Sequence, residues 1–236
     1  MKTVILTPLG SQTHHNFTHS LQATERAFPG QIDWVDTAGV SDVAAGRNRL
    51  LDEFLRMTMA GACVWIDSDE SWTPADLSAV LTPIVCGDAE VVAAPYAVKK
   101  QGVPWYNFAL HLEDCDIEKG YIGPRKTIGG RDYVRVRYAG TGFLAMSRAA
   151  AMRAAAIVPR YQLPMTDRVI AGLFEPMIEN CHRYGEDYGA CRTMGQAGLE
   201  ILLALKTKII HYDGLQRFDT EALDLDVLAR GQAAKK

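Results

Sequence analysis

Three acidic side chains follow a short apolar run in the segment VWIDSDESWTP, residues 64–74. Asp67 and Asp69 are two positions apart, so in extended backbone their side chains project to the same side. Two such carboxylates form a compact site of hard oxygen ligands, which suits Mg²⁺ or Mn²⁺, and a diphosphate can complete the shell. The alternative is a solvated acidic turn that only caps the following helix. Glu70 is assigned to the turn or to the start of an acceptor side.

Arg47 is a second candidate, because it shares the apolar stripe of a predicted helix. Val43, Arg47, Leu50 and Phe54 follow one another at spacings of four, three and four residues. Burying an arginine without a partner is costly. We therefore expect Arg47 to meet an anion or a polar base of a ligand, or to form a core salt bridge with Asp36.

Glu186 and Asp187 follow Gly185 and open another predicted helix. The helix dipole favours acidic residues at this end by about 0.3–1 kcal/mol, which is a sufficient structural reason for them. The functional interpretation is that one of them meets an acceptor hydroxyl, either as a general base or as an orienting group.

Histidines and glycines supply weaker signals. His211 ends an apolar run and is a candidate third metal ligand, although a lone histidine is more often only hydrogen-bonded. His15 and His19 have the spacing of a zinc pair on a helix, but no further ligand is apparent. The stretch Gly140, Thr141, Gly142 permits close backbone approach to a ligand, or it forms a tight turn into a strand.

The first hundred residues alternate short apolar runs with helix-forming stretches, which predicts a parallel sheet covered by helices. Ligands of such sheets bind at the carboxyl ends of the strands. Pro8, Asp36 and Asp67 all fall at these ends and should converge on one edge. The expected strands are 2–8, 31–36, 62–66 and 89–95. The expected helices are 16–28, 41–59 and one that begins at Pro74. Ser41 is the expected N-cap of the second helix, and Thr73 and Asp76 form a capping box for the third.

The second half is less regular. We expect a strand over 139–147, a helix over 148–156, a loop with short helical pieces over 158–180, a helix from Glu186 to about Gly198, and strands over 201–205 and 207–214. The tail 219–236 has the pattern of an amphipathic helix that frays. The segment 119–137 carries six cations against Asp132, which predicts a site for phosphates or a nucleic-acid acceptor, or a solvated loop. These cations are Lys119, Arg125, Lys126, Arg131, Arg135 and Arg137.

Length and composition indicate one domain of 236 residues with a formal net charge of −3, which excludes a strongly basic global surface. We divide it into a nucleotide-binding half, 1–100, an acceptor half, 101–218, and the tail. The five cysteines are odd in number and form no CxxC pair, so we expect a reduced, cytoplasmic protein. No run approaches the roughly 18 apolar residues that span a bilayer.

Taken in order, six stretches resemble a GT-A-fold glycosyltransferase, either of the family 2 type or of the fungal mannan-polymerase α-mannosyltransferase type. The match runs from about Lys2 to Gly214. Its six parts are KTVILTP, GRNRLLDEF, VWIDSDESWTPADL, AGTGFLAMSR, GEDYGACRTMGQAG and IIHYDG. They are similar to the first nucleotide-binding strand, the A-R-N-x-L helix, the D-x-D strand and helix, the glycine-entered strand, the E-D helix and the closing V-x-H-x-G.

This resemblance implies a GT-A-like, Rossmann-type mixed sheet, mostly parallel and flanked by helices. It also implies transfer of a sugar from a UDP- or GDP-linked donor to a hydroxyl acceptor such as a glycan. If the basic segment 119–137 holds DNA, the acceptor would be a hydroxylated base in phage-type DNA. Mn²⁺ or Mg²⁺ would be bound by Asp67, Asp69 and His211, and Asp187 or Glu186 would face the acceptor. The implied nucleotide-sugar residues are Thr7, Pro8, Asp36, Arg47, Asp67, Gly140, Thr141 and Gly142.

Two alternatives stay open at this point. A nucleotidyltransferase on a related sheet should carry a glycine-rich loop with lysine or arginine after the first strand, whereas the loop here reads PLGSQTHHN. A non-catalytic module that binds carbohydrate or nucleic acid would leave a nucleotide-sugar donor intact.

Overall fold

A nine-stranded sheet forms the centre of the computed structural model, which describes residues 2–9, 13–40, 42–97, 107–111, 123–163, 166–214 and 216–218. The strand order is β2-β1-β3-β9-β5-β14-β8-β6, and β7 pairs with β8. The strands are β1 (Lys2–Thr7), β2 (Ile32–Asp36), β3 (Ala60–Ile66), β5 (Val91–Ala93), β6 (Phe108–Leu110), β7 (Arg125–Ile128), β8 (Arg131–Ala139), β9 (Phe143–Ser147) and β14 (Ile201–Ala204).

The direction of the strands brings distant parts of the chain to one edge. β1 is parallel to β2 and β3, and β5 is parallel to β14, whereas β9 runs antiparallel between β3 and β5. The beginning of β9 therefore lies where β3 and β5 end. The expected mixed α/β sheet flanked by helices is confirmed.

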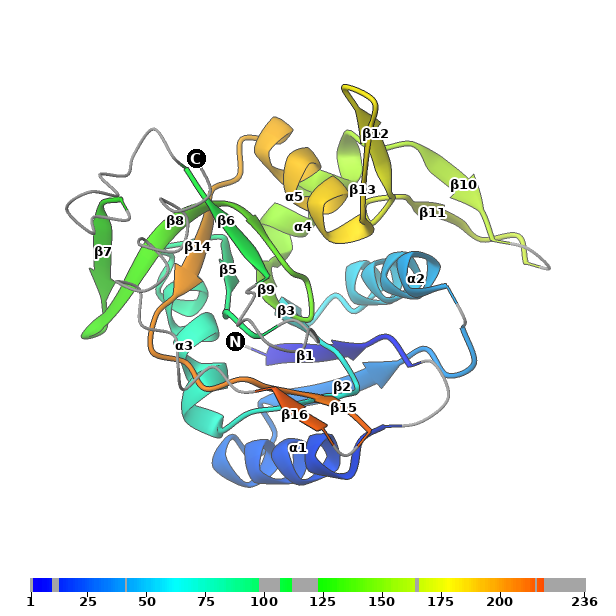
Figure 1. Ribbon diagram of the computed structural model, residues 1–236. Helices are drawn as coiled ribbons and strands as arrows, with labels where there is room; N and C mark the ends of the chain where they lie inside the picture. The colour runs from blue at the N-terminus through cyan, green and yellow to red at the C-terminus, as the bar shows by residue number, and fades with distance from the viewer. Residues whose placement is uncertain are drawn as a thin grey trace.

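Five helices cover the two faces of this sheet (Figure 1). They are α1 (His15–Ala27), α2 (Val43–Arg56), α3 (Pro74–Cys86), α4 (Arg148–Ala156) and α5 (Glu186–Gln196). The apolar side chains of α1 and α3 join one buried cluster, and those of α2, α4 and α5 join the other. Because β1, β3, β5 and β9 contribute to both clusters, they are buried on both faces and read as continuous apolar runs.

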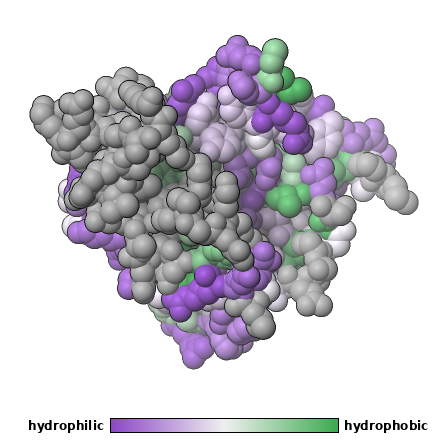
Figure 2. Space-filling view, in the orientation of Figure 1, coloured by the Kyte–Doolittle hydropathy of each residue, from purple (hydrophilic) through white to green (hydrophobic). Residues whose placement is uncertain are grey.

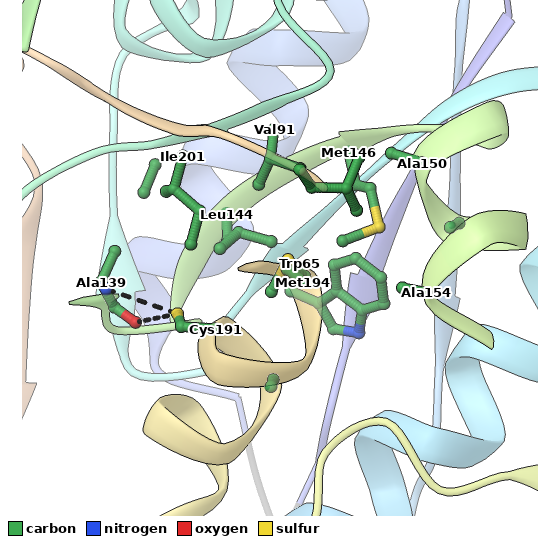
Figure 3. Close-up of a cluster of buried hydrophobic side chains, with 14 of the residues drawn as sticks. Trp65, Val91, Ala139, Leu144, Met146, Ala150, Ala154, Cys191, Met194 and Ile201 are labelled. Carbon is green, nitrogen blue, oxygen red and sulfur yellow. Dashed lines mark hydrogen bonds between the residues drawn. The ribbon is translucent and has the colours of Figure 1, made fainter. Parts of the chain in front are cut away.

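Trp65 of β3 fills the cluster under α2, α4 and α5 (Figure 3). Its side chain is fully buried and lies 5.0 Å from the ring of Phe174, measured between centroids. In the same cluster, the thiol of Cys191 on α5 donates to the carbonyl of Ala139 at 3.2 Å. These contacts fix α5, and thus its N-terminus, against the end of β8.

The helix boundaries follow from local chemistry. Thr73 and Asp76 form the predicted capping box of α3, with Pro74 in the first turn. The N-cap of α2 is Asp42, whose carboxylate accepts from the amides of Ala44 and Ala45. The prediction of Ser41 as the cap was therefore one residue early, and Ser41 itself lies outside the described residues. The predicted C-terminal helix 219–236 and Lys119 also lie outside them.

The loop with short helical pieces expected over 158–180 is wrong, because one hairpin and the first strand of a second hairpin lie in this stretch. β10 (Arg160–Gln162) pairs with β11 (Val169–Ala171), and β12 (Met177–Glu179) pairs with β13 (His182–Tyr184). Strands of three residues are too short to show a period in the sequence. Figure 2 shows hydrophobic surface at the tip of the β12–β13 hairpin, where Ile178 is 76% exposed.

A second, three-stranded sheet lies in the lower part of the molecule in Figure 1, and its strand order is β16-β15-β4. It is built from β4 (Glu70–Ser71), β15 (Ile210–Asp213) and β16 (Gln216–Phe218). His211 pairs with Glu70 in this sheet, so the end of the described chain lies beside the acidic turn. Within the described residues, no helix is long and apolar enough to cross a membrane.

Candidate active site

The ends of β1 and β2 meet at the predicted edge. Thr7 lies opposite Asp36 in the parallel register, and the indole nitrogen of Trp34 donates to the Thr7 hydroxyl at 3.0 Å. A Cβ added at Gly46 of α2 would lie 3.2 Å from the hydroxyl of Thr37 and 3.6 Å from the Cβ of Pro8, so this turn of α2 contacts both residues. Thr7, Pro8 and Asp36 are therefore brought together, next to the first turns of α2.

Arg47 lies under this edge and is 2% exposed. Its guanidinium donates to the carbonyl of Thr141 at 2.9 Å and to a carboxylate oxygen of Asp67 at 3.1 Å. Burial alone would lower the pKa of Arg47, but the carboxylates of Asp67 and Asp187 raise it above its ordinary value. The partner of this buried cation is thus Asp67 rather than Asp36, the salt-bridge partner considered from the sequence.

Asp67 lies directly after β3 and is held from two sides. Its amide donates to the carbonyl of Gly142 at 2.9 Å, and its second oxygen is 2.9 Å from the guanidinium of Arg47. Burial raises the pKa of this carboxyl, Arg47 lowers it, and the neighbouring Asp69 raises it again. Burial is the largest of these effects, so the net direction of the pKa shift is upward.

The Thr141–Gly142 turn connects these groups to α5. The Thr141 side chain is fully buried, and its hydroxyl donates to a carboxylate oxygen of Asp187. The Thr141 carbonyl accepts from Arg47, as described above. This turn therefore joins the buried cation, the carboxylate after β3 and the carboxylate at the start of α5 within one hydrogen-bond network.

Gly142 is required by the packing of this turn. A Cβ at this position would lie 2.6 Å from an oxygen of Glu70, 2.7 Å from the hydroxyl of Tyr96 and 2.8 Å from an oxygen of Asp67. The amide of Gly142 donates to the same Tyr96 hydroxyl at 3.1 Å. Three oxygen atoms from three elements thus pack against one Cα, which only glycine permits.

Glu70 is the least expected member of the site. Its side chain is fully buried, and neither carboxylate oxygen has a hydrogen-bond partner among the residues that the structure describes. Burial raises its pKa well above the ordinary value, and the carboxylates of Asp67 and Asp69 raise it further. Glu70 closes the acidic turn, where its amide donates to the carbonyl of Asp67 at 3.1 Å, and it begins β4. Its buried, unpartnered carboxyl is costly and was not expected from the sequence.

Asp69 and His211 meet on the outer side of the turn. The Nε2 atom of His211 lies 3.5 Å from a carboxylate oxygen of Asp69. The Nδ1 atom of His211 is 3.0 Å from the carbonyl of Ala97, so this nitrogen carries the hydrogen and donates. Nε2 is therefore the ring nitrogen that faces Asp69. The Tyr96 ring packs edge-on against the imidazole, with 5.4 Å between centroids.

This arrangement fits a divalent cation only in part. Ligands on one Mg²⁺ or Mn²⁺ lie roughly 3 Å apart, which Asp69 and His211 approach, and a backbone carbonyl on the second ring nitrogen is usual for a ligating histidine. Within the described part of the chain, however, no group of three or more His, Cys, Asp or Glu is arranged to hold a metal by itself. Asp67 is turned toward Arg47, so Asp69 and His211 are the two predicted metal ligands that lie side by side.

Other predicted residues lie around this centre. Glu186 is adjacent to Asp187 at the start of α5, and Gly140 precedes the Thr141–Gly142 turn. His15 and His19 are exposed on α1, with 6.1 Å between ring centroids, and belong to no metal cluster within the described residues. The amide of His14, the N-cap of α1, donates to the carbonyl of Ser68 at 2.8 Å, which ties α1 to the acidic turn.

Sequence reasoning missed two supporting side chains. Tyr96 follows β5 and contacts both Gly142 and His211, but no spacing in the sequence relates these three residues. Asn48 of α2 is fully buried; its carbonyl oxygen accepts from the amide of Phe174 and its nitrogen donates to Glu175, both at 2.8 Å. Asn48 thereby fixes the loop against which α5 packs. It lies next to Arg47 in the quoted GRNRLLDEF motif, which was the available signal.

Comparison with known proteins defines the fold class. No protein-family model matches the chain, and no curated protein matches it in sequence. Among solved structures, A197 from STIV is similar over 90% of this chain and 86% of its own, with 16% identity and a TM-score of 0.56. The structures that match include glycosyltransferases, and the chain has a GT-A-like fold.

Two of the glycosyltransferase structures are longer than this chain. GalNAc-T7, solved with UDP, GalNAc and Mn²⁺, matches over 89% of this chain and 44% of its own, with 9% identity and a TM-score of 0.50. S. aureus TarS 1-349 matches over 86% of this chain and 58% of its own, with 12% identity and a TM-score of 0.48. The chain therefore spans about half of their length.

Gly142→Ala tests the packing of the turn. The added methyl group overpacks the three oxygen atoms around it, so we expect the free energy of unfolding to fall by about 1–3 kcal/mol. Thermal or urea unfolding measures this change. Gly195→Ala is the control, because a Cβ there meets nothing within 4 Å. Equal stability of the two variants would contradict the described packing.

Glu70→Gln tests the buried carboxyl through the pH dependence of unfolding in EDTA. Because the pKa of Glu70 is raised in the folded state, its contribution to stability is full below about pH 4.3, the usual glutamate pKa, and is lost as the pH rises toward the folded-state value. Glu70→Gln has no carboxyl group to titrate at this position, so it does not lose this stability as the pH rises. We expect it to be more stable than the parent by about 1–3 kcal/mol at neutral pH and equal to it near pH 4.

The matched control for this experiment is Glu25→Gln on the exposed side of α1. It changes the same functional group where burial plays no part. A stability difference for Glu70→Gln that is constant from pH 4 to pH 8 would show that the carboxyl titrates normally.

Proposed function

We propose that this protein is a metal-dependent glycosyltransferase, which moves a sugar from a UDP- or GDP-linked donor to a hydroxyl acceptor on a glycan or on a hydroxylated base in DNA. The supporting observation is the Thr141–Gly142 turn. It joins Arg47, Asp67 and Asp187 at the carboxyl edge of a GT-A-like sheet, which is the edge where open α/β sheets bind ligands.

The donor would lie along the ends of β1, β2 and β3. Thr7, Pro8 and Asp36 border the place for the base and ribose, and Arg47 holds Asp67 in position from below. Asp69 and His211 would hold Mn²⁺ or Mg²⁺ together with the diphosphate. When bound, the cation supplies a Lewis acid that stabilises the charge of the nucleoside diphosphate leaving group.

The acceptor would enter beside Asp187. A hydroxyl oxygen attacks the anomeric carbon, and the bond from that carbon to the diphosphate oxygen breaks. In an inverting reaction, the free carboxylate oxygen of Asp187 accepts the hydroxyl proton. In a retaining reaction, the same group orients the donor or the acceptor. Thr141 limits the rotation of Asp187 in either case, because its hydroxyl donates to the other oxygen.

Donor turnover tests this proposal directly. A panel of UDP- and GDP-sugars with Mn²⁺ should release nucleoside diphosphate for at least one donor, and EDTA should suppress the release. Asp69→Ala removes one of the two proposed ligands that lie close together, so we expect metal-dependent donor binding to weaken more than tenfold, as typical for a lost ligand contact.

The control for Asp69→Ala is Asp33→Ala, which removes a carboxylate from the surface ion pair with Lys2. It should leave donor binding unchanged. Both variants should unfold cooperatively near the parent temperature. Full donor turnover by Asp69→Ala, or by the parent in EDTA, would refute the metal site.

Asp187→Asn separates binding from chemistry. It keeps the shape and the hydrogen bond from Thr141 but removes the carboxylate that meets the acceptor. We expect kcat to fall by about 10²–10⁴, the usual contribution of a general acid or base, while donor binding by calorimetry stays within twofold. An unchanged kcat would remove Asp187 from the mechanism.

A further inference from the structure

A cleft of about 550 Å³ lies between α5 and β8, outside the donor edge. Its walls come from the C-terminal half of α5, the middle of β8 and the approach to β14. Cys191 on α5 is one of its lining residues, and it lies one helical turn beyond Asp187, about 6 Å along the helix axis. The cleft and the proposed acceptor carboxylate thus share the same helix.

The charge in this cleft differs from that of the protein as a whole. Arg135, Arg137 and Arg192 line it, against one carboxylate from Glu200. The Arg135–Glu200 pair is wide, at 3.9 Å between charged atoms, and both side chains are substantially exposed. Arg192 pairs with Glu179 at 2.5 Å, but its Nε–H is buried and has no acceptor among the described residues. Three arginines against the carboxylates of Glu200 and Glu179 leave one positive charge in excess at this cleft, on a chain with a net charge of −3.

One tyrosine ring lies beside these cations in the cleft. The guanidinium of Arg137 lies 5.1 Å from the centroid of Tyr138, which also lines the cleft. Tyr138 packs against Tyr188 at 4.8 Å, and Tyr188 packs against Tyr184 at 6.1 Å. Because Tyr188 directly follows Asp187, a row of tyrosines extends from the cleft to the catalytic end of α5.

We propose that this cleft binds the acceptor, and that the acceptor is a single-stranded nucleic acid. Arg135 and Arg137 provide contacts for phosphates, and the row of tyrosine rings that begins at Tyr138 provides stacking surfaces for bases. An acceptor strand held along α5 would place one nucleotide beside Asp187. This inference rests on the proposed transfer to a hydroxyl, and it selects the nucleic-acid branch of the two acceptor classes.

Two β8 arginines can be removed without touching the donor edge. Binding of a fluorescein-labelled, mixed-sequence single-stranded 12-nucleotide DNA is measured by anisotropy, in EDTA and without donor. A plot of log K against log salt has a negative slope, and each lost phosphate contact makes this slope less steep by about 0.7 for single strands. Arg135→Gln/Arg137→Gln should therefore reduce the slope by about 1.4 and weaken binding roughly tenfold at 50 mM salt.

The matched control is Arg26→Gln/Arg153→Gln, which removes the same charge from α1 and α4, away from the cleft. It should bind DNA within twofold of the parent. Tyr138→Leu removes an aromatic ring and leaves the charge of the cleft unchanged. It should therefore weaken DNA binding roughly fivefold while the salt slope stays the same. Equal loss in the cleft and control variants, or no loss in either, would overturn the proposal.

Competition identifies the ligand class. Unlabelled poly(dT) should displace the labelled strand at a lower charge concentration than dextran sulfate. Stronger competition by dextran sulfate would assign the cleft to an anionic glycan and overturn the nucleic-acid inference.

The binding assay is independent of transfer. If every nucleotide-sugar is left intact while the cleft variants still lose DNA binding, the proposed reaction fails and the cleft stands. If a donor is turned over while the cleft variants bind DNA like the parent, the reaction stands and the cleft proposal fails.

Discussion

The neutralisation of one buried guanidinium governs this site. Arg47 is held below the carboxyl edge of the sheet, where water cannot solvate it, so carboxylates and carbonyls must approach it. Asp67 contacts the guanidinium from the end of β3, and the Thr141 carbonyl contacts it from the turn before β9. The carboxylates also depend on Arg47, because the negative charges of the acidic turn after β3 would repel one another without this cation. The elements of the site are thus fixed by mutual charge compensation more than by any single motif.

The antiparallel strand β9 makes that compensation possible. In a fully parallel sheet, the residues before a strand lie at the far edge from the carboxyl ends of its neighbours. Because β9 runs against β3 and β5, its entrance lies beside Asp67 and Tyr96. The glycine at this entrance then lets three oxygen atoms approach one backbone atom. The mixed direction of the sheet is therefore a requirement of the site.

The sequence predicted the parts of this arrangement that have a local signal. Apolar runs, helix caps and the stripe of α2 located Asp36, Arg47, Asp67 and the start of α5, because each depends on residues within a few positions. The burial of Glu70 has no such signal, because its strand partner His211 lies more than a hundred residues later in the chain. The same reason hid Tyr96, and the strands within 158–180 were too short to produce a period.

The pairing of β15 with β4 also has a consequence for the order of assembly. A chain is synthesised from its N-terminus, and its early elements fold first. The acidic turn and Arg47 are present early, whereas His211 arrives only after all of the nine central strands have been made. The pair of Asp69 and His211 therefore cannot form before β15 has been synthesised and has paired with β4. A chain that has been made only as far as β14 contains the other described groups of the site but lacks this imidazole.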